Sequence, residues 1–273
     1  MSLPVTIRFS HSSTFWDSYW GKSGITLEPR LSSRWITNIA YAGRLVSLPI
    51  PLATFFLPTG HAIPNPPPLS NIMSAILPNT LTKPQLTKGL QSKSRLVQHL
   101  TANLLVKSLR KLLEVVSCFK RISNLLGEDQ AIGSWECRKI EVLKDAKRRL
   151  PEVQVIIALL QHDHVSRSKQ PALGGAKPPH LESAQDQSLS GEMSLRLVWL
   201  YFQSFPEMQS EARFDVGKLL FNVMGDKSTG TDSASQLTGL NQLHILRILR
   251  DSHHFTWSAK LGNVSCVSQL PIR

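Results

Sequence analysis

The residues best suited to chemistry in this sequence are lysines and arginines in two groups. Lys107, Arg110 and Lys111 are spaced i, i+3 and i+4, which puts them on one face of a helix. The second group consists of Lys144, Lys147, Arg148 and Arg149. Ammonium and guanidinium groups in a row bind phosphates without reading bases. Both groups are therefore predicted to bind nucleic acid, with an ordinary solvated helix face as the alternative.

The chain as a whole carries the same excess of positive charge. Its 273 residues include 31 Lys and Arg against 19 Asp and Glu, a formal net charge of +12. This excess favours an acidic partner, either nucleic acid or an anionic membrane surface; a basic protein without a polyanionic partner is the alternative. With 41% hydrophobic residues, the chain can bury a core and is not disordered as a whole.

Other motifs that could carry chemistry are incomplete. The "GKSG" at residues 21–24 resembles the end of a phosphate-binding P-loop, but Trp16 replaces the first glycine. His162 and His164 could ligate a metal, yet no further ligand is placed to complete a tetrahedral set. No GxSxG, HExxH or recognisable Cys/His spacing occurs. We therefore expect no catalytic, cofactor-binding or metal site, and a protein that is not an enzyme.

Cysteine usage and apolar segments indicate the compartment. Cys118, Cys137 and Cys266 form no CxxC pair, which fits a reducing compartment. The N-terminus lacks the features of a signal peptide. The most apolar stretch, residues 45–57, is too short to span a bilayer and is interrupted by prolines. A soluble, non-secreted protein is expected.

Helices must position the two basic groups, and the sequence predicts helices almost throughout. The stretch from Leu96 to Val116 contains no Pro or Gly, and its leucines recur at helical spacing. Residues 151–161 are rich in β-branched side chains, so a buried strand is the alternative there. Further helices are predicted within residues 31–48, 69–77, 81–91, 94–126, 135–150, 194–205, 207–223 and 237–252.

The order of these segments predicts an all-α fold. Sequential amphipathic helices pack as antiparallel pairs, in a bundle or an α-solenoid. Residues 1–28 are expected to be a poorly structured N-terminal segment. From Val165 to Met193 no apolar period appears, and a disordered insert is predicted at residues 162–193.

Several phrases occur together in a recognisable order. They are "LSSRWITNIAYAGRLVSLPIP", "LTKPQLTKGLQSKSRLVQHLTANLL", "KRRLPEVQVIIALLQ", "EARFDVGKLL" and "LHILRILRDSHHFTWSAK". In these phrases the chain resembles the N-terminal region of the nucleolar pre-ribosomal-associated protein family, especially its fungal members. The resemblance runs from about Pro29 to about Lys260, interrupted by the insert. It implies a helical-repeat region at residues 29–260, followed by a divergent tail at residues 261–273.

The resemblance implies a fold and a function that spacing alone does not. Family members are similar to armadillo or HEAT-like α-solenoids and act as non-catalytic scaffolds in early large-subunit pre-ribosomes, within the nucleolus of the nucleus. They are needed for rRNA processing and work with a helicase-containing assembly subcomplex and small nucleolar RNPs. The implied partners are therefore pre-ribosomal particle proteins and rRNA, with no membrane and no small-molecule substrate.

Two departures from the family bear on this expectation. Family members are much longer, and the tail "LGNVSCVSQLPIR" is unlike the family sequence. We expect a shortened product or an incomplete gene model. The competing hypothesis is a protein–protein adaptor whose basic face binds acidic protein segments rather than RNA.

Overall fold

A computed structural model describes residues 26–50, 55–57, 59–129, 132–168, 182–212 and 232–251. Within these ranges the chain is helical, and its only β-type pairing is an isolated bridge between Phe56 and Ala62. The prediction of an all-α protein is therefore confirmed. The helices are α2 (Ser33–Val46), α3 (Leu69–Ile76), α4 (Lys83–Leu90), α5 (Arg95–Leu126), α6 (Ser134–Arg149), α7 (Val153–Ser168), α8 (Glu182–Ser204), α9 (Glu207–Glu211) and α11 (Asp232–Arg250).

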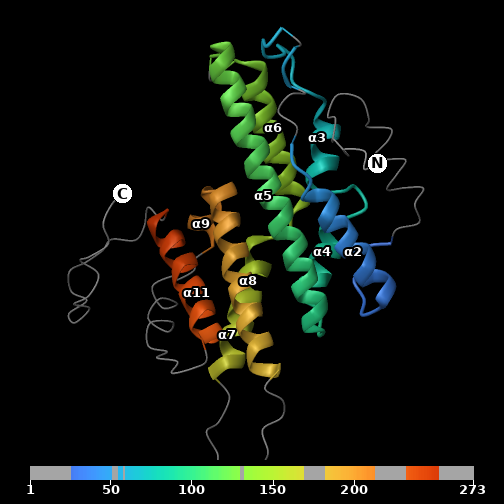
Figure 1. Cartoon of the computed structure of the whole chain (residues 1–273), viewed down its shortest axis with the longest axis vertical. Coiled ribbons are helices and arrows are strands. Elements are labelled where there is room, and N and C mark those ends of the chain that lie inside the picture. The colour runs from blue at the N-terminus through green and yellow to red at the C-terminus, as the bar shows by residue number, and fades with distance from the viewer. Residues whose placement is uncertain are drawn as a thin grey trace, which may run out of the picture.

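The long helix α5 is the central element. Its 32 residues contact α2, α3, α4, α6 and α8, and it runs through the middle of the molecule in Figure 1. Leu104, Leu105, Leu109 and Leu112 are all buried, as their helical spacing predicts. The helix ends where Gly127 adopts a left-handed conformation with φ of 63°. Helix α6 begins seven residues after Gly127 and packs along α5, which makes α5 and α6 an antiparallel pair (Figure 1).

Local capping signals in the sequence fix the starts of α2 and α4. The Ser32 hydroxyl accepts a hydrogen bond from the backbone N–H of Trp35 and caps α2. Thr82 and Gln85 form a reciprocal capping box at the start of α4. Pro84 lies in the first turn of α4, where its missing N–H leaves no hydrogen bond unmade.

The non-helical segment before α3, residues 55–57 and 59–68, is held by aromatic packing, and we call it the connector. Phe55, Phe119 and Trp135 contact one another edge to face, with ring centroids 5.1–6.1 Å apart. The indole Nε1 of Trp135 donates a hydrogen bond of 3.0 Å to the carbonyl of Ile63 in the connector. The connector is therefore attached to both α5 and α6, although it is not helical itself.

A second group of helices forms around α8. This helix contacts α5, α7, α9 and α11, and Figure 1 shows α9 and α11 on the side of α8 away from α2 and α4. The hydroxyl of Tyr201, fully buried in α8, donates to the carbonyl of Pro151 just before α7. Residues 153–161 are helical, so the strand alternative for this segment is wrong. None of the described helices is both long enough and apolar enough to cross a membrane.

The prediction of a disordered insert at residues 162–193 is wrong at both ends. Helix α7 continues to Ser168 and α8 already begins at Glu182, while residues 169–181 lie outside the described part. The polar composition of this segment was misleading because one of its polar residues, Glu192, is buried with charged partners. The P-loop-like residues 21–24, most of the expected N-terminal segment and the expected tail also lie outside the described residues, so those boundaries stay predictions.

Candidate nucleic-acid interface

Lys111, from the first predicted basic group, is not on the surface. Only 3% of it is exposed, and its Nζ donates a hydrogen bond to the carbonyl of Leu48, just after α2. Glu114 lies 3.9 Å from the same Nζ. Burial lowers the pKa of Lys111, and the negative charge of Glu114 offsets part of this effect. The prediction that Lys111 lies on a solvent-facing side of the helix is therefore wrong.

The other two members of this group face different neighbours. Lys107 is half-buried, and its Nζ lies 3.1 Å from the point where a Cβ would stand at Gly43 of α2. Arg110 is exposed on the α8 side, where partial burial and the charge of Arg196 lower its pKa and Glu192 acts in the opposite direction. Their i, i+3, i+4 spacing does not give these residues one shared surface, because α2 and α8 pack on both sides of it.

Two members of the second group are held by other side chains. Lys147 Nζ lies 3.0 Å from Glu207 Oε1 of α9. Arg149 Nε lies 2.8 Å from Asp145 Oδ2, and its Nη1 donates to Asn79 at 2.7 Å. These cations join α6 to α9 and to the loop before α4. They therefore have a structural role in addition to any role at a surface.

Lys144 and Arg148 remain on the surface of α6. They are one helical turn apart on the same face, and both are exposed. Arg148 is tied to Asp145 through Nη2 at 2.5 Å, but its side chain is still 77% exposed, so other guanidinium donors face solvent. Lys144 makes no ion pair within the described residues. The Lys144–Arg148 pair is the part of the predicted site that can reach a phosphate.

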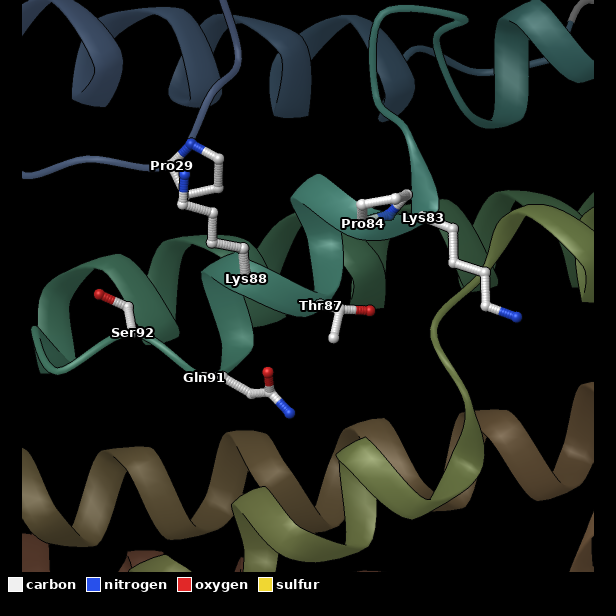
Figure 2. Close-up of a pocket in the computed structure, with 7 residues that line it drawn as sticks. All are labelled: Pro29, Lys83, Pro84, Thr87, Lys88, Gln91 and Ser92. Atoms are coloured by element: carbon white, nitrogen blue, oxygen red, sulfur yellow. The ribbon is translucent and has the colours of Figure 1, made fainter.

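A groove of about 690 Å³ lies along α4, at the side facing Pro29 (Figure 2). Its two lysines are already paired: Lys88 with Glu28, and Lys83 with Glu152. Figure 2 shows Lys83 extending toward the loop before α7, while Gln91 points from the end of α4 toward the helix beneath it. The charge of this groove is therefore largely neutralised.

A second groove, of about 350 Å³, begins at Gln91 and lies between the α4–α5 turn and α7; we call it the α4–α7 groove. Its polar side chains are Gln91, Ser92, Lys93, Arg95 and Gln98. Its apolar side is formed by Leu90, Val155, Ala158 and Leu159. The sequence did not predict this site, because the two sides come from segments about 60 residues apart that no pattern connects. The two neighbouring cations Lys93 and Arg95 were the one sign in the sequence that this surface could bind a ligand.

Metal binding has no candidate in the described residues. No three His, Cys, Asp or Glu side chains there are grouped so that they could hold an ion. The side chains of His162 and His164 fall outside what the structure describes. Free Cys118 is buried, which raises the pKa of its thiol to about 11, whereas free Cys137 is exposed.

Comparison with known proteins gives one informative similarity. The chain is 28% identical over 139 residues to nucleolar pre-ribosomal-associated protein 1 of Saccharomyces cerevisiae. The aligned region covers 51% of this chain but 7% of the yeast protein, so the chain spans a small part of that relative's length. No family model and no solved structure matches the chain. The similarity supports a distant link to the family that the sequence phrases resemble.

Proposed function

We propose that this chain is a non-catalytic helical scaffold segment in ribosome biogenesis, acting in early large-subunit assembly and rRNA processing through protein and rRNA contacts. The observation that carries the proposal is the similarity to the yeast nucleolar pre-ribosomal-associated protein. The proposed location is the nucleolus, and the proposed partners are pre-ribosomal particles. A helicase-containing subcomplex and small nucleolar RNPs are the partners that the family resemblance adds.

The proposed architecture is an armadillo- or HEAT-like array. Antiparallel packing of α5 with α6, and the succession of α7, α8 and α11 beside them, support such an arrangement. In an array of this kind each helix pair buries its apolar face against its neighbours and leaves polar faces for partners. That division of roles suits a scaffold better than an enzyme.

The proposed rRNA contact is centred on the Lys144–Arg148 pair. Phosphate recognition needs exposed donors that are not fully used within the protein, and this pair meets that condition. Lys107 and Arg110 are the second choice, since each is partly covered by a neighbouring helix. Lys147 and Arg149 would first have to leave Glu207 and Asp145. Lys111 is not included because it is buried.

The adaptor hypothesis remains the second candidate function. It is favoured by the α4–α7 groove, whose two cations lie beside apolar side chains rather than beside aromatic rings that could stack on bases. In this case the basic surface would bind acidic segments of assembly factors. Both functions are compatible with a scaffold, but they predict different ligands.

Crosslinking in cells tests the rRNA contact. The tagged chain is expressed in cells, crosslinked by ultraviolet light and purified under denaturing conditions, and the attached RNA is sequenced. We expect enrichment of pre-rRNA over messenger RNA, and a loss of that enrichment in the Lys144→Gln/Arg148→Gln double variant. A matched control with the same charge change is Lys93→Gln/Arg95→Gln. Crosslinks that are absent, or spread over RNA classes in proportion to abundance, would contradict the proposal.

A further inference from the structure

The α4–α7 groove combines free polar groups with accessible apolar surface. Within the described residues, the side chains of Gln91, Lys93, Arg95 and Gln98 have no hydrogen-bond or ion-pair partner. Opposite them, Val155 is half-buried and Ala158 is exposed on α7. In the neighbouring groove along α4, by contrast, Lys83 and Lys88 are paired with carboxylates. The groove therefore differs from its surroundings in having charge that the protein itself does not neutralise.

The chemistry of this lining indicates the class of partner. Two cations attract carboxylates or phosphates. The amides of Gln91 and Gln98 each supply a donor and an acceptor, which is what the N–H and C=O groups of a peptide backbone require. The apolar side formed by α7 can cover an aliphatic side chain.

Single-stranded RNA fits the groove less well. Proteins that bind single strands without sequence preference place aromatic rings under successive bases. None of the groove residues is aromatic. Aliphatic side chains next to cations instead match a peptide in which acidic residues flank a leucine or isoleucine. A volume of about 350 Å³ has room for a few side chains and not for a folded domain.

We propose that the α4–α7 groove binds a short acidic peptide segment of another protein, with carboxylates on Lys93 and Arg95 and an aliphatic side chain against Val155 and Ala158. The small contact area makes this a weak, transient interaction. We expect a Kd of about 10–100 μM at low salt, on the usual relation between affinity and free energy. The inference uses the groove alone and does not depend on the nucleolar role proposed above.

Fluorescence anisotropy on the whole chain tests the groove directly. The probe is the fluorescein-labelled peptide Asp-Glu-Leu-Asp-Glu-Leu-Glu-Asp, and a second peptide carries serine in place of both leucines. A labelled oligouridine of eight nucleotides is measured in parallel. The variant Lys93→Gln/Arg95→Gln removes the two cations, and Lys120→Gln/Arg121→Gln changes the net charge equally at the exposed far end of α5. The variant Ala158→Glu puts a repelling charge on the apolar side. Circular dichroism establishes that each variant keeps its helices.

The expected pattern separates the two surfaces. The leucine peptide should bind the parent chain and the Lys120→Gln/Arg121→Gln variant within about twofold of each other, because charges far from the groove act on the peptide only at long range and are screened. The variants Lys93→Gln/Arg95→Gln and Ala158→Glu should weaken it at least fivefold. The serine peptide should bind more weakly than the leucine peptide to the parent chain, since burial of each leucine adds apolar stabilisation.

Three results would overturn the proposal. Equal loss in the groove variant and in Lys120→Gln/Arg121→Gln would mean that net charge alone attracts the peptide. Equal affinity of the leucine and serine peptides would mean that the apolar side formed by α7 does not contribute to binding. Loss of oligouridine binding in the groove variant, with peptide binding unchanged, would make the groove a phosphate site. None of these results bears on whether the chain crosslinks to pre-rRNA, so the two proposals fail separately.

Discussion

Glu192 of α8 and His244 of α11 are both buried, and Glu192 Oε1 lies 2.8 Å from His244 Nε2. Arg196 Nε donates to the same carboxylate oxygen at 2.8 Å. The Trp199 and His244 rings lie 5.9 Å apart, and the guanidinium carbon of Arg247 is 4.7 Å from the centroid of Trp199. These polar and aromatic contacts attach α11 to α8 in addition to the apolar packing of the two helices.

Replacing Glu192 should therefore destabilise the protein strongly. The variant Glu192→Ala removes the carboxylate that bonds buried His244 and half-buried Arg196. Because both partners are then left unpaired, we expect a loss of about 3–5 kcal/mol in the free energy of unfolding. Urea unfolding monitored by circular dichroism measures the loss. The matched control is Glu141→Ala, whose carboxylate is 52% exposed and pairs with Arg138. It should change stability by no more than about 0.5 kcal/mol. Similar effects of both variants would show that the buried contact does not stabilise the docking of α11.

The same carboxylate predicts a loss of stability in acid. Burial raises the pKa of Glu192, but hydrogen bonds from His244 and Arg196, and their charges, outweigh it and hold the pKa below its ordinary value of 4.5. A carboxyl whose pKa is lower in the folded state contributes stability above the unfolded pKa and loses it as pH falls through the folded pKa. Unfolding free energies measured from pH 6 to pH 3 should therefore decrease. In Glu192→Gln the decrease should be smaller, and an identical pH profile would contradict this assignment.

Substitutions at Lys111 should reveal that this residue is buried. Lys111→Met keeps the apolar stem but leaves the Leu48 carbonyl without its donor, for an expected loss of about 1–3 kcal/mol. Lys111→Glu buries an unmatched negative charge near Glu114 and should lose about 3–5 kcal/mol or unfold the chain. Thermal denaturation compares both with Lys144→Glu on the surface of α6, which should leave the melting temperature nearly unchanged. Changing Lys107, Arg110 and Lys111 together to Glu would therefore test stability more than RNA binding.

The close approach of α4 to α5 depends on Gly89. A Cβ at this position would lie 2.8 Å from Cγ2 and 3.1 Å from Cβ of Thr101, a branched side chain that cannot move aside. We expect Gly89→Ala to destabilise the protein by about 1–3 kcal/mol, as overpacked cores do. Thr101→Ala added to it should restore part of the loss, which a double-mutant cycle measures. Additive losses would mean that the two side chains do not meet.

The sequence predicted the helices well because the signals for them are local. Capping by Ser32 and Thr82 and the leucine spacing of α5 depend on residues a few positions apart, and the structure confirms them. The segment before Met193 was predicted wrongly for the opposite reason. Glu192 belongs to a helix because His244, 52 residues later, supplies its partner, and no local pattern contains that information.

The candidate site could be predicted only in part. The residue types were visible in the sequence, but whether a cation is available depends on neighbours that are distant in the chain. Buried Lys111 donates a hydrogen bond to the carbonyl of Leu48, and Lys147 forms an ion pair with Glu207. Lys144 has no such partner within the described residues. Charge spacing on a helix predicts a face, and tertiary packing decides whether that face is free.

Both helix groups pack against α5, so the centre of this helix is exposed only when the protein unfolds as a whole. At 32 residues α5 is roughly 48 Å long, at 1.5 Å per residue, and both the α2–α4 side and the α8 side pack along it. Leu105 and Leu109 are fully buried in the middle of α5, and we expect their amide protons to meet solvent only when the helices packed along α5 separate. Their hydrogen exchange should therefore be the slowest in the chain and should report the global unfolding equilibrium, while amides at the start of α2 exchange through local fraying.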